Sequence, residues 1–120
     1  MTTTAALHAF FNSFDIPAFA ETDVSKRDYP YMTYAVPISH LDEGETAGTV
    51  NIWYKTESEA IPNAKAAELA AAIGRGCKEL RCDDGIILIK RGSPWCQPLN
   101  DETDTTIKRR YINISVEFIT

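Results

Sequence analysis

The chain has 120 residues, a net charge of −5, and 24% charged against 44% hydrophobic residues. This length is that of one ordinary domain, so we expect residues 1–120 to form a single domain. The composition is too apolar for a disordered chain, and no apolar run approaches the roughly 20 residues of a membrane helix. With no signal peptide at its start, we expect a soluble, intracellular protein without a membrane partner.

The charges are unevenly distributed along the chain. Residues 1–60 carry nine acids against three bases, whereas residues 61–120 carry nine bases against eight acids. Basic residues occur only in short runs, which argues against a dedicated nucleic-acid binder. Two interpretations remain for the uneven distribution. Either the charges keep the surface soluble, or copies dock head to tail, the acidic half of one against the more basic half of the next.

The cysteines and histidines show no pattern typical of a catalytic or metal site. Cys77, Cys82 and Cys96 are an odd number without a CxxC pair, which favours reduced thiols over disulfides or a zinc site. Neither His8 nor His40 has a second histidine or a cysteine at ligand spacing. The sequence therefore predicts no metal, no cofactor and no enzyme activity.

The first predicted element is an amphipathic helix over about residues 4–14, capped by Thr3 or Thr4 and ended by Pro17. One face of this helix carries large apolar side chains at helical spacing, and we expect it in the core: Leu7, Phe10, Phe11 and Phe14.

A polar stretch without period, residues 17–30, is expected to be a connecting loop. Residues 31–38 are rich in strand formers, and because proline has no N–H, this strand should lie at a sheet edge or end near Pro37. Val50, Ile52 and Tyr54 alternate with polar neighbours and predict the second strand of a hairpin. The acidic turn between the two strands contains Asp42, Glu43 and Glu45.

A helix is predicted after this hairpin. Thr56 and Glu59 match the capping box, and Gly74 should end the helix. A stripe of small residues at helical spacing is expected to let the helix lie close on the sheet: Ala60, Ala64, Ala67 and Ala71.

The C-terminal third predicts further strands. Residues 77–89 form a second hairpin around the turn at Asp83-Asp84, and a loop over residues 93–106 follows. Trp95, in that loop, is either folded onto the core or offered to a partner. The last strand should bury alternate residues, namely Ile112, Ile114, Val116 and Phe118. Before it, Lys108, Arg109 and Arg110 are expected to be solvated or paired with Asp101, Glu102 and Asp104.

These elements predict an α+β fold of order α-β-β-α-β-β-β. We expect a twisted, mostly antiparallel sheet of four to five strands, with the two helices packed on it. The last strand and the strand before Pro37 are expected to leave sheet edges that neighbouring copies can cover.

The chain resembles the tail terminator proteins, also called tail-completion or minor capsid proteins, of long-tailed bacteriophages and prophages of Gram-positive bacteria. The resemblance rests on an apolar strand followed by an aromatic and a glutamine, IILIKRGSPWCQP from Ile86, and on the final strand, TIKRRYINI from Thr106 followed by VEF from Val116. It also covers the opening helix, YPYMTY from Tyr29 and the Trp53-Tyr54 strand.

The resemblance implies a small α/β fold assembled as a hexameric ring that sits on the head-proximal end of the tail tube. Such a ring stops tail polymerisation and offers a surface for head–tail joining. The implied partners are further copies of the chain, the major tail tube protein and the head connector or stopper protein, with DNA only as passing cargo. No catalysis and no cofactor are implied. The implied locations are the bacterial host cytoplasm during assembly, and then the virion tail.

The family offers no active site, so the resemblance transfers only candidate interface positions: Trp95, Gln97, Arg109, Arg110 and Tyr111. If DNA passes through the ring, we expect an acidic loop to face the channel and repel phosphate. The candidate loops are Asp42 to Glu45 and Asp101 to Asp104, and solvated turns on the outside of the ring are the alternative.

Two other function classes remain. One is a small monomeric adaptor that binds a single protein. The other is a small enzyme or ligand-binding domain whose pocket lies between the first helix and the sheet, although the sequence shows no set of polar groups that would converge there.

Overall fold

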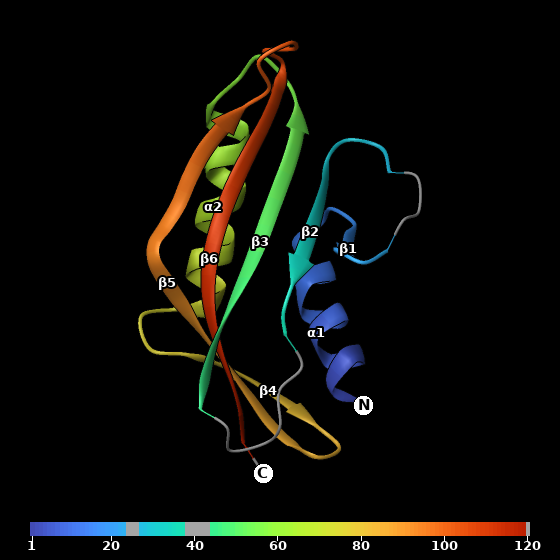
Figure 1. Ribbon diagram of the computed structural model, residues 1–120, viewed down its shortest axis with the longest axis vertical. Coiled ribbons are helices and arrows are strands. Elements are labelled where there is room, and N and C mark those ends of the chain that lie inside the picture. Colours follow the sequence, from blue (N-terminus) through green and yellow to red (C-terminus); the bar gives the residue numbers. More distant parts are fainter. Residues whose placement is uncertain (24–26, 38–43, 120) are drawn as a thin grey trace.

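The computed structural model describes residues 1–23, 27–37 and 44–119 and has an α+β architecture (Figure 1). Six strands form one mixed, strongly curled half-barrel sheet in the order β1-β2-β3-β6-β5-β4. The elements in chain order are α1 (Thr3–Phe11), a 3-10 turn (Asn12–Phe14), β1 (Ala18–Ala20), β2 (Tyr31–Ala35), β3 (Glu45–Lys55), α2 (Ala60–Ile73), β4 (Lys78–Cys82), β5 (Gly85–Asn100) and β6 (Ile107–Ile119). The predicted class and the two helices are confirmed, but the sheet has six strands rather than four or five, and the order is α-β-β-β-α-β-β-β.

The additional strand is β1, which lies in the segment predicted as a loop. It pairs in parallel with β2, in contrast to the other, antiparallel pairs among the described strands, and this makes the sheet mixed. Three residues are too few to show an alternating pattern, so the sequence gives no sign of this strand. The Asn12 side chain satisfies backbone groups of β1. Its oxygen accepts from the Ala18 amide at 3.0 Å, and its nitrogen donates to the Ala18 carbonyl at 3.2 Å.

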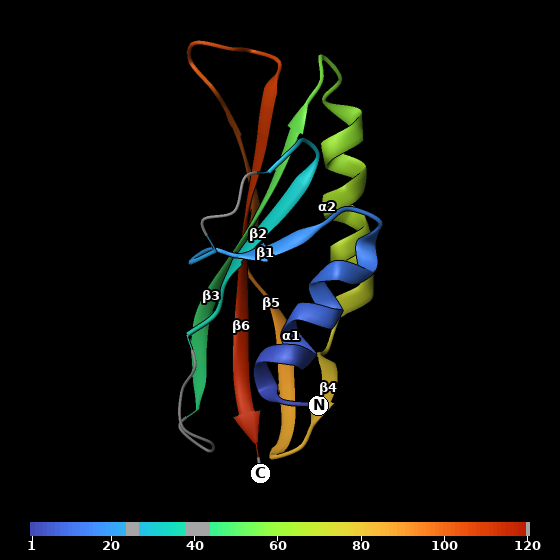
Figure 2. The ribbon, with the colours of Figure 1, turned by 90° about the vertical axis from the view of Figure 1, so that its right-hand side faces the viewer.

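Both helices pack on the same face of the sheet, which we call the inner face (Figure 2). The phenylalanine face of α1 is buried there as predicted, and Phe11 stacks on Tyr34 with ring centroids 4.6 Å apart. The cap differs from the prediction, because it is the Thr2 hydroxyl that accepts from the Ala5 amide. In the described part of the chain, neither helix is long and apolar enough to cross a membrane.

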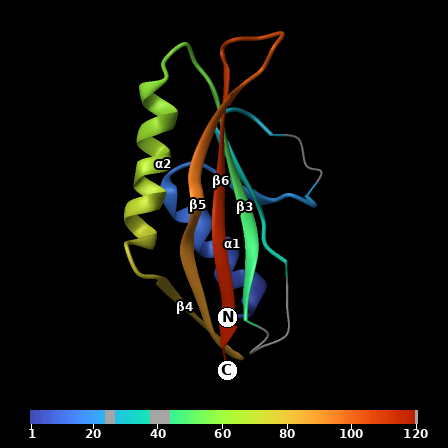
Figure 3. The same ribbon diagram turned by 60° about the vertical axis from the view of Figure 1, so that its left-hand side comes forward.

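α2 lies along the sheet beside β5 (Figure 3), but the face that it buries differs from the prediction. The alanine stripe faces solvent, and the helix instead buries Pro62, Ala66, Leu69 and Ile73. Larger side chains fill the space above the sheet and remove more apolar surface from water than alanine would, so they decide the rotation of the helix. Gly74, at φ 79°, ends the helix as predicted.

The capping box does not form, because α2 begins at Ala60 rather than after Thr56, so Glu59 is the N-cap residue and not the third residue of the helix. Glu59 has other partners. Its carboxylate accepts from Arg110 at 2.5 Å and lies 3.3 Å from the Lys108 ammonium, while Arg110 also donates to the Asn63 side chain at 2.8 Å. Arg110 is 1% and Lys108 7% exposed. The basic triplet is therefore neither solvated nor paired mainly with Asp101 to Asp104. Two of its cations are buried and hold the start of α2 on β6.

Most of the loop predicted over residues 93–106 is strand. β5 continues to Asn100 through an irregularity in which Asn113 of β6 faces the four residues Gly92 to Trp95. The Asn113 side chain donates to the Pro94 carbonyl at 2.8 Å and holds this bulge. The bulge explains why the alternation is lost here, since the extra residues shift which side chains face inward.

The last strand does not leave a sheet edge. β6 lies between β3 and β5 and is paired on both sides, and β2 lies between β1 and β3. The strand before Pro37 was predicted either to lie at a sheet edge or to end near Pro37, and β2 does the latter, since it ends at Ala35. An open side remains on β5 beyond Ile89, where β4 no longer pairs with it. Pro94 and Pro98 supply no N–H there, which protects this edge from strand addition.

Gly92 is required by the bulge. A β-carbon at this position would lie 2.7 Å from the backbone of Asn113, whereas one at Gly76 would meet nothing within 4 Å. We expect Gly92→Ala to lower the free energy of unfolding by about 1–3 kcal/mol, because strand backbone must move to relieve the clash. The matched control Gly76→Ala should stay within about 0.5 kcal/mol of wild type. Urea titration followed by circular dichroism measures both, and equal stability of the two variants would contradict this account of the bulge.

The Glu59 contact should make stability depend on pH. The hydrogen bond from Arg110, followed by that from Lys108, holds the pKa of Glu59 below its ordinary value of 4.5 despite partial desolvation. A lowered folded-state pKa stabilises the fold above pH 4.5, and this contribution disappears as the pH falls through the lowered value. The stability difference between wild type and Glu59→Gln should therefore be constant near neutral pH and shrink in acid.

Urea titrations between neutral pH and about pH 3 measure this difference. Glu57→Gln is the control, because Glu57 makes no hydrogen bond or ion pair with a described residue.

Glu59→Gln should also lower the stability more than Arg110→Met does. Glu59→Gln leaves two buried cations without their carboxylate, whereas after Arg110→Met the half-exposed Glu59 carboxylate can be hydrated. The reverse ranking would contradict the role assigned to this contact.

Candidate functional site

The outer face of the sheet, opposite the helices, carries a row of large side chains across four strands. Register places Tyr31 of β2 beside Trp53 of β3, Trp53 beside Arg109 of β6, and Arg109 beside Leu99 of β5. Their neighbours along each strand point inward to the core, because side chains alternate across a sheet. We call this surface the aromatic–arginine face and define it by Phe19, Arg27, Tyr29, Tyr31, Trp53, Leu99, Arg109 and Tyr111.

The rings and guanidinium groups of this face pack on one another. Tyr31 and Trp53 stack with centroids 5.9 Å apart and planes at 16°. The Arg109 guanidinium lies 5.0 Å from the centre of the Trp53 ring and 5.6 Å from that of Tyr111, and Arg27 packs in the same way on Phe19 and Tyr31 at 5.3 and 5.8 Å. The flat faces of these rings are therefore partly covered by neighbours within the chain.

A polar layer beneath the rings fixes their orientation. Asn51 and Thr33 are 5% and 6% exposed although they point to the outer side of the sheet. The Nε of Arg109 donates to the Asn51 side-chain oxygen at 2.7 Å, and the Trp53 indole N–H donates to the Thr33 hydroxyl at 3.4 Å. The two terminal nitrogens of Arg109 find no hydrogen-bond acceptor among the described residues and remain available to an external carboxylate or carbonyl.

The face has cationic and neutral groups at neutral pH. Burial, and after it the neighbouring Tyr29, raise the pKa of Tyr31 above 10.0, although Arg27 acts in the opposite direction. The Tyr31 hydroxyl is therefore uncharged over the physiological range. The positive charge of the face comes from its two arginines.

This combination favours contact with a protein surface. Tyrosine, tryptophan and arginine are the residues enriched at the centres of protein interfaces. A platform for nucleic-acid bases needs free ring faces, and here these faces are partly covered by neighbours within the chain. Among the described residues, no group of three metal-ligating side chains is close enough to hold a metal ion.

A groove adjoins this face at the open side of β3. It has a volume of about 840 Å³, lies between α1 and the sheet, and is lined mainly by apolar groups. Tyr111 belongs to both the groove and the aromatic–arginine face. The Tyr34 hydroxyl, also in the lining, lies 3.2 Å from His8 Nδ1. The described lining residues are Thr4, Leu7, Ala20, Glu21, Thr22, Tyr34, Ala35, Val36, Pro37, Ala47, Gly48, Thr49, Tyr111 and Asn113.

Three of the five predicted interface residues lie on the outer face. Arg109 and Tyr111 belong to the aromatic–arginine face, and Gln97 lies directly opposite Tyr111 in the ladder. Arg110 points to the inner face and is buried, so its side chain is engaged within its own chain.

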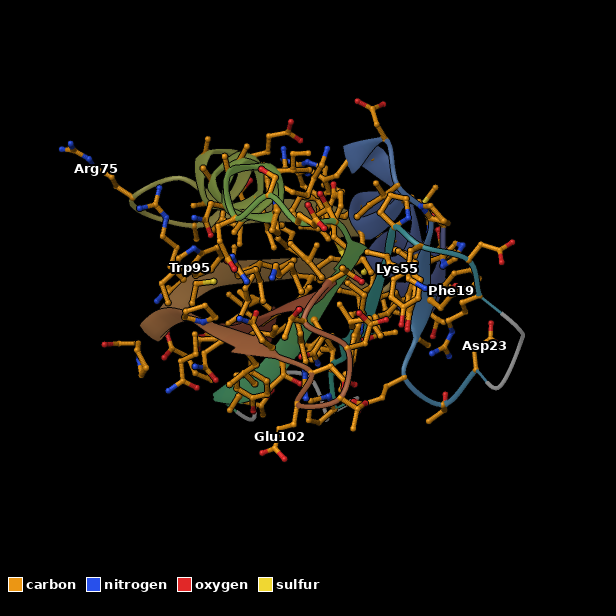
Figure 4. All side chains as sticks on the ribbon, turned by 90° about the horizontal axis from the view of Figure 1, so that it is seen from above. Phe19, Asp23, Lys55, Arg75, Trp95 and Glu102 are labelled. Atoms are coloured by element: carbon orange, nitrogen blue, oxygen red, sulfur yellow. The ribbon has the colours of Figure 1, made fainter. Side chains whose placement is uncertain are left out.

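Trp95 lies apart from these three. It sits in the β5 bulge, half buried against the core, on the other side of the molecule from Phe19 (Figure 4). Of the two predicted alternatives, folding onto the core is therefore partly confirmed, because the ring packs on the core while some of it remains exposed.

Sequence reasoning missed six residues of this face as site residues: Phe19, Arg27, Tyr29, Tyr31, Trp53 and Leu99. The alternation around Trp53 already indicates that this ring points away from the core. Its neighbours follow only from strand register, which links residues 20 to 60 positions apart in the chain.

The acidic loops are only partly described. Asp42 and Glu43 lie outside the described residues. Glu45 accepts from Lys90 at 2.6 Å, and this hydrogen bond lowers the pKa of the Glu45 carboxyl. The β5–β6 turn lies at the opposite end of the long axis of the molecule, which extends 45 Å (Figure 1). Glu45 and the acids of the β5–β6 turn therefore cannot line the same narrow constriction within one copy.

In the β5–β6 turn, the acids also have local structural roles. The Asp101 carboxylate accepts from the Thr103 hydroxyl and amide, and that of Asp104 accepts from the same two groups of Thr106. These hydrogen bonds lower the pKa of both carboxyls. Turn formation by itself therefore accounts for two of the acids at this end.

Comparison with known proteins adds no relative. No model of a known protein family matches the chain, and no curated protein is significantly similar to it. The function is therefore inferred from the aromatic–arginine face, the groove and the sequence resemblance.

Proposed function

We propose that the chain is a structural subunit of a homo-oligomeric ring, with six copies, at the head-proximal end of a phage tail tube. The ring ends tail polymerisation and supplies the surface for head–tail joining. It assembles in the bacterial cytoplasm and remains in the virion tail. Its partners are other copies of the chain, the major tail tube protein and the head connector.

The aromatic–arginine face is the observation that carries this proposal. It extends over β1, β2, β3, β6 and β5, and a buried polar layer holds its side chains in place. Five of the six strands of this 120-residue chain thus contribute to one surface. Buried tyrosine, tryptophan and arginine at the centre of a contact give the largest contributions to protein association. A ring subunit needs such surfaces for its neighbours and for the tube, and it needs no reaction chemistry.

The groove favours a second candidate function, a ligand-binding domain. A volume of about 840 Å³ lies within the range of small-molecule sites, and its lining is mainly apolar, as in such sites. The convergent polar groups are few, however, and Glu21 is the one charged side chain among the described lining residues. A monomeric chain that binds an apolar ligand would favour this candidate over the ring.

The ring proposal is tested by deleting the gene in the phage or prophage that encodes it. We expect tail tubes of uncontrolled length that fail to join heads, as seen by electron microscopy, and recovery when the wild-type chain is supplied. A particle extracted from wild-type virions should contain the chain at six copies per tail. Tails of normal length, joined to heads in the deletion strain, would overturn the proposal.

The channel-facing role of the acidic loop has its own test. Replacing Asp42, Glu43 and Glu45 with lysine reverses the charge of this loop, and a basic channel should hold DNA through its phosphates in a salt-dependent way. We expect complete particles that eject DNA more slowly, with the defect reduced at high salt. The control is Asp101→Lys with Glu102→Lys, at the opposite end of the molecule. Wild-type ejection from the triple variant would assign Asp42, Glu43 and Glu45 to the outside of the ring.

A further inference from the structure

The outward face of α2 is unusually apolar for an exposed surface. Ala60, Ala64, Ala67 and Ala71 follow one stripe on the side opposite the buried residues of the helix, and no other described element covers them. Ile61 beside the stripe is 49% exposed. Glu57 precedes the helix and forms no bond within the described chain. The stripe therefore offers apolar surface next to an unpaired carboxylate.

The two apolar surfaces of the molecule face in opposite directions. α2 packs on the inner face of the sheet (Figure 2). Its exposed stripe points away from the sheet, whereas the aromatic–arginine face lies on the outer side. One copy cannot bring these surfaces together within itself. Two copies can do so head to tail, and each copy then still has one surface free for the next.

We infer that the aromatic–arginine face of one copy docks on the alanine stripe of α2 in a second copy. This inference rests on the proposed ring and specifies which surfaces its subunits use.

The chemistry of the two surfaces is complementary. The sheet side presents cations, with the terminal nitrogens of Arg109 free to donate, and the helix side presents the free carboxylate of Glu57. Alanine loses no side-chain entropy on burial, and its small size lets ring edges and Leu99 approach the helix closely. Opposite charges at the margin of such a contact set its orientation and exclude the reversed arrangement.

This pairing differs from the one based on the halves of the sequence. Arg27 belongs to the acidic half of the chain, yet it joins Arg109 from the basic half on the outer face through Tyr31 and Trp53. Cations from both halves of the sequence therefore meet on the outer face, so the halves of the sequence do not define the docking surfaces.

The size of the contact predicts its strength. The 14 residues of α2 extend about 21 Å, and the row from β2 to β5 spans about 14 Å between outer strands, so the footprint is on the order of 300–400 Å² per copy. This is below the roughly 800 Å² per partner of a standard stable interface. Association of two copies should therefore be weak and concentration-dependent, and ring closure strengthens it because every copy then makes two contacts.

The test uses variants that disable one surface each. Leu99→Glu and, separately, Arg109→Glu alter the aromatic–arginine face, and Leu99 is exposed enough for its variant to fold. Ala64→Arg alters the stripe at an exposed helical position that arginine tolerates well. Arg81→Glu on β4 and Ala9→Arg on α1 are matched controls at exposed positions outside both surfaces. Sedimentation and chemical shift changes up to millimolar concentration measure association of each full-length chain.

We expect wild type and both controls to associate, and each surface variant alone to remain monomeric. An equimolar mixture of Leu99→Glu and Ala64→Arg should form a dimer that does not grow, since one intact surface of each kind remains. Association of Ala64→Arg alone would indicate a symmetric contact between two sheet faces and overturn the inference. A wild-type chain that stays monomeric at all concentrations would also overturn it.

The same variants separate this inference from the proposed function. If the wild-type chain restores normal tails and Leu99→Glu restores them equally well, the ring stands and the assigned contact is wrong. If the mixture forms the expected dimer but deletion of the gene leaves tails normal, the contact stands and the ring at the tail end is wrong.

Discussion

The pairing of β6 on both sides is the constraint on which the rest of the structure depends. β3 pairs with β6 in unbroken register from Glu45 to Lys55, and β5 pairs with its other side. In a strand buried in this way, a shift by one residue would exchange the two faces completely. The register therefore decides two things at once. It directs Ile112, Ile114, Val116 and Phe118 into the core, and it directs Arg109 and Tyr111 to the outer face.

The same strand also sets the position of α2. Lys108 and Arg110 follow the inward alternation of β6, where they cannot reach water, so they need a partner from the layer above. Glu59 supplies the carboxylate and Asn63 the amide oxygen, and both lie at the start of α2. Once this end of the helix is held, Leu69 and Ile73 pack on the sheet, and the alanines point outward. The Glu59–Arg110 contact and the apolar residues of α2 therefore favour the same rotation of the helix, which leaves the alanine stripe outside.

The outer face is unusual because its polar groups are underneath and its aromatic groups on top. Asn51 and Thr33 are covered by Trp53 and Arg109, which they hold in place through hydrogen bonds. Side chains already orientated lose less entropy when a partner covers them. A surface built in this way suits a protein contact that forms repeatedly, as in an assembly of identical subunits, and this is the physical basis for the proposed ring.

By itself, the sequence determined the α+β class, the two helices, the phenylalanine face and the inward residues of the last strand, because helical and strand periodicity are local properties of the chain. Glu59 could not be assigned from sequence, since a capping box and a distant arginine compete for one carboxylate and only the packed structure brings Arg110 within 2.5 Å. β1 was too short for any period, and the Gly92 bulge interrupted the alternation that β5 otherwise follows. The aromatic–arginine face joins Phe19, Tyr31, Trp53 and Arg109 from four strands. Strand order and register bring them together, and these depend on the free energy of the whole sheet rather than on neighbouring residues.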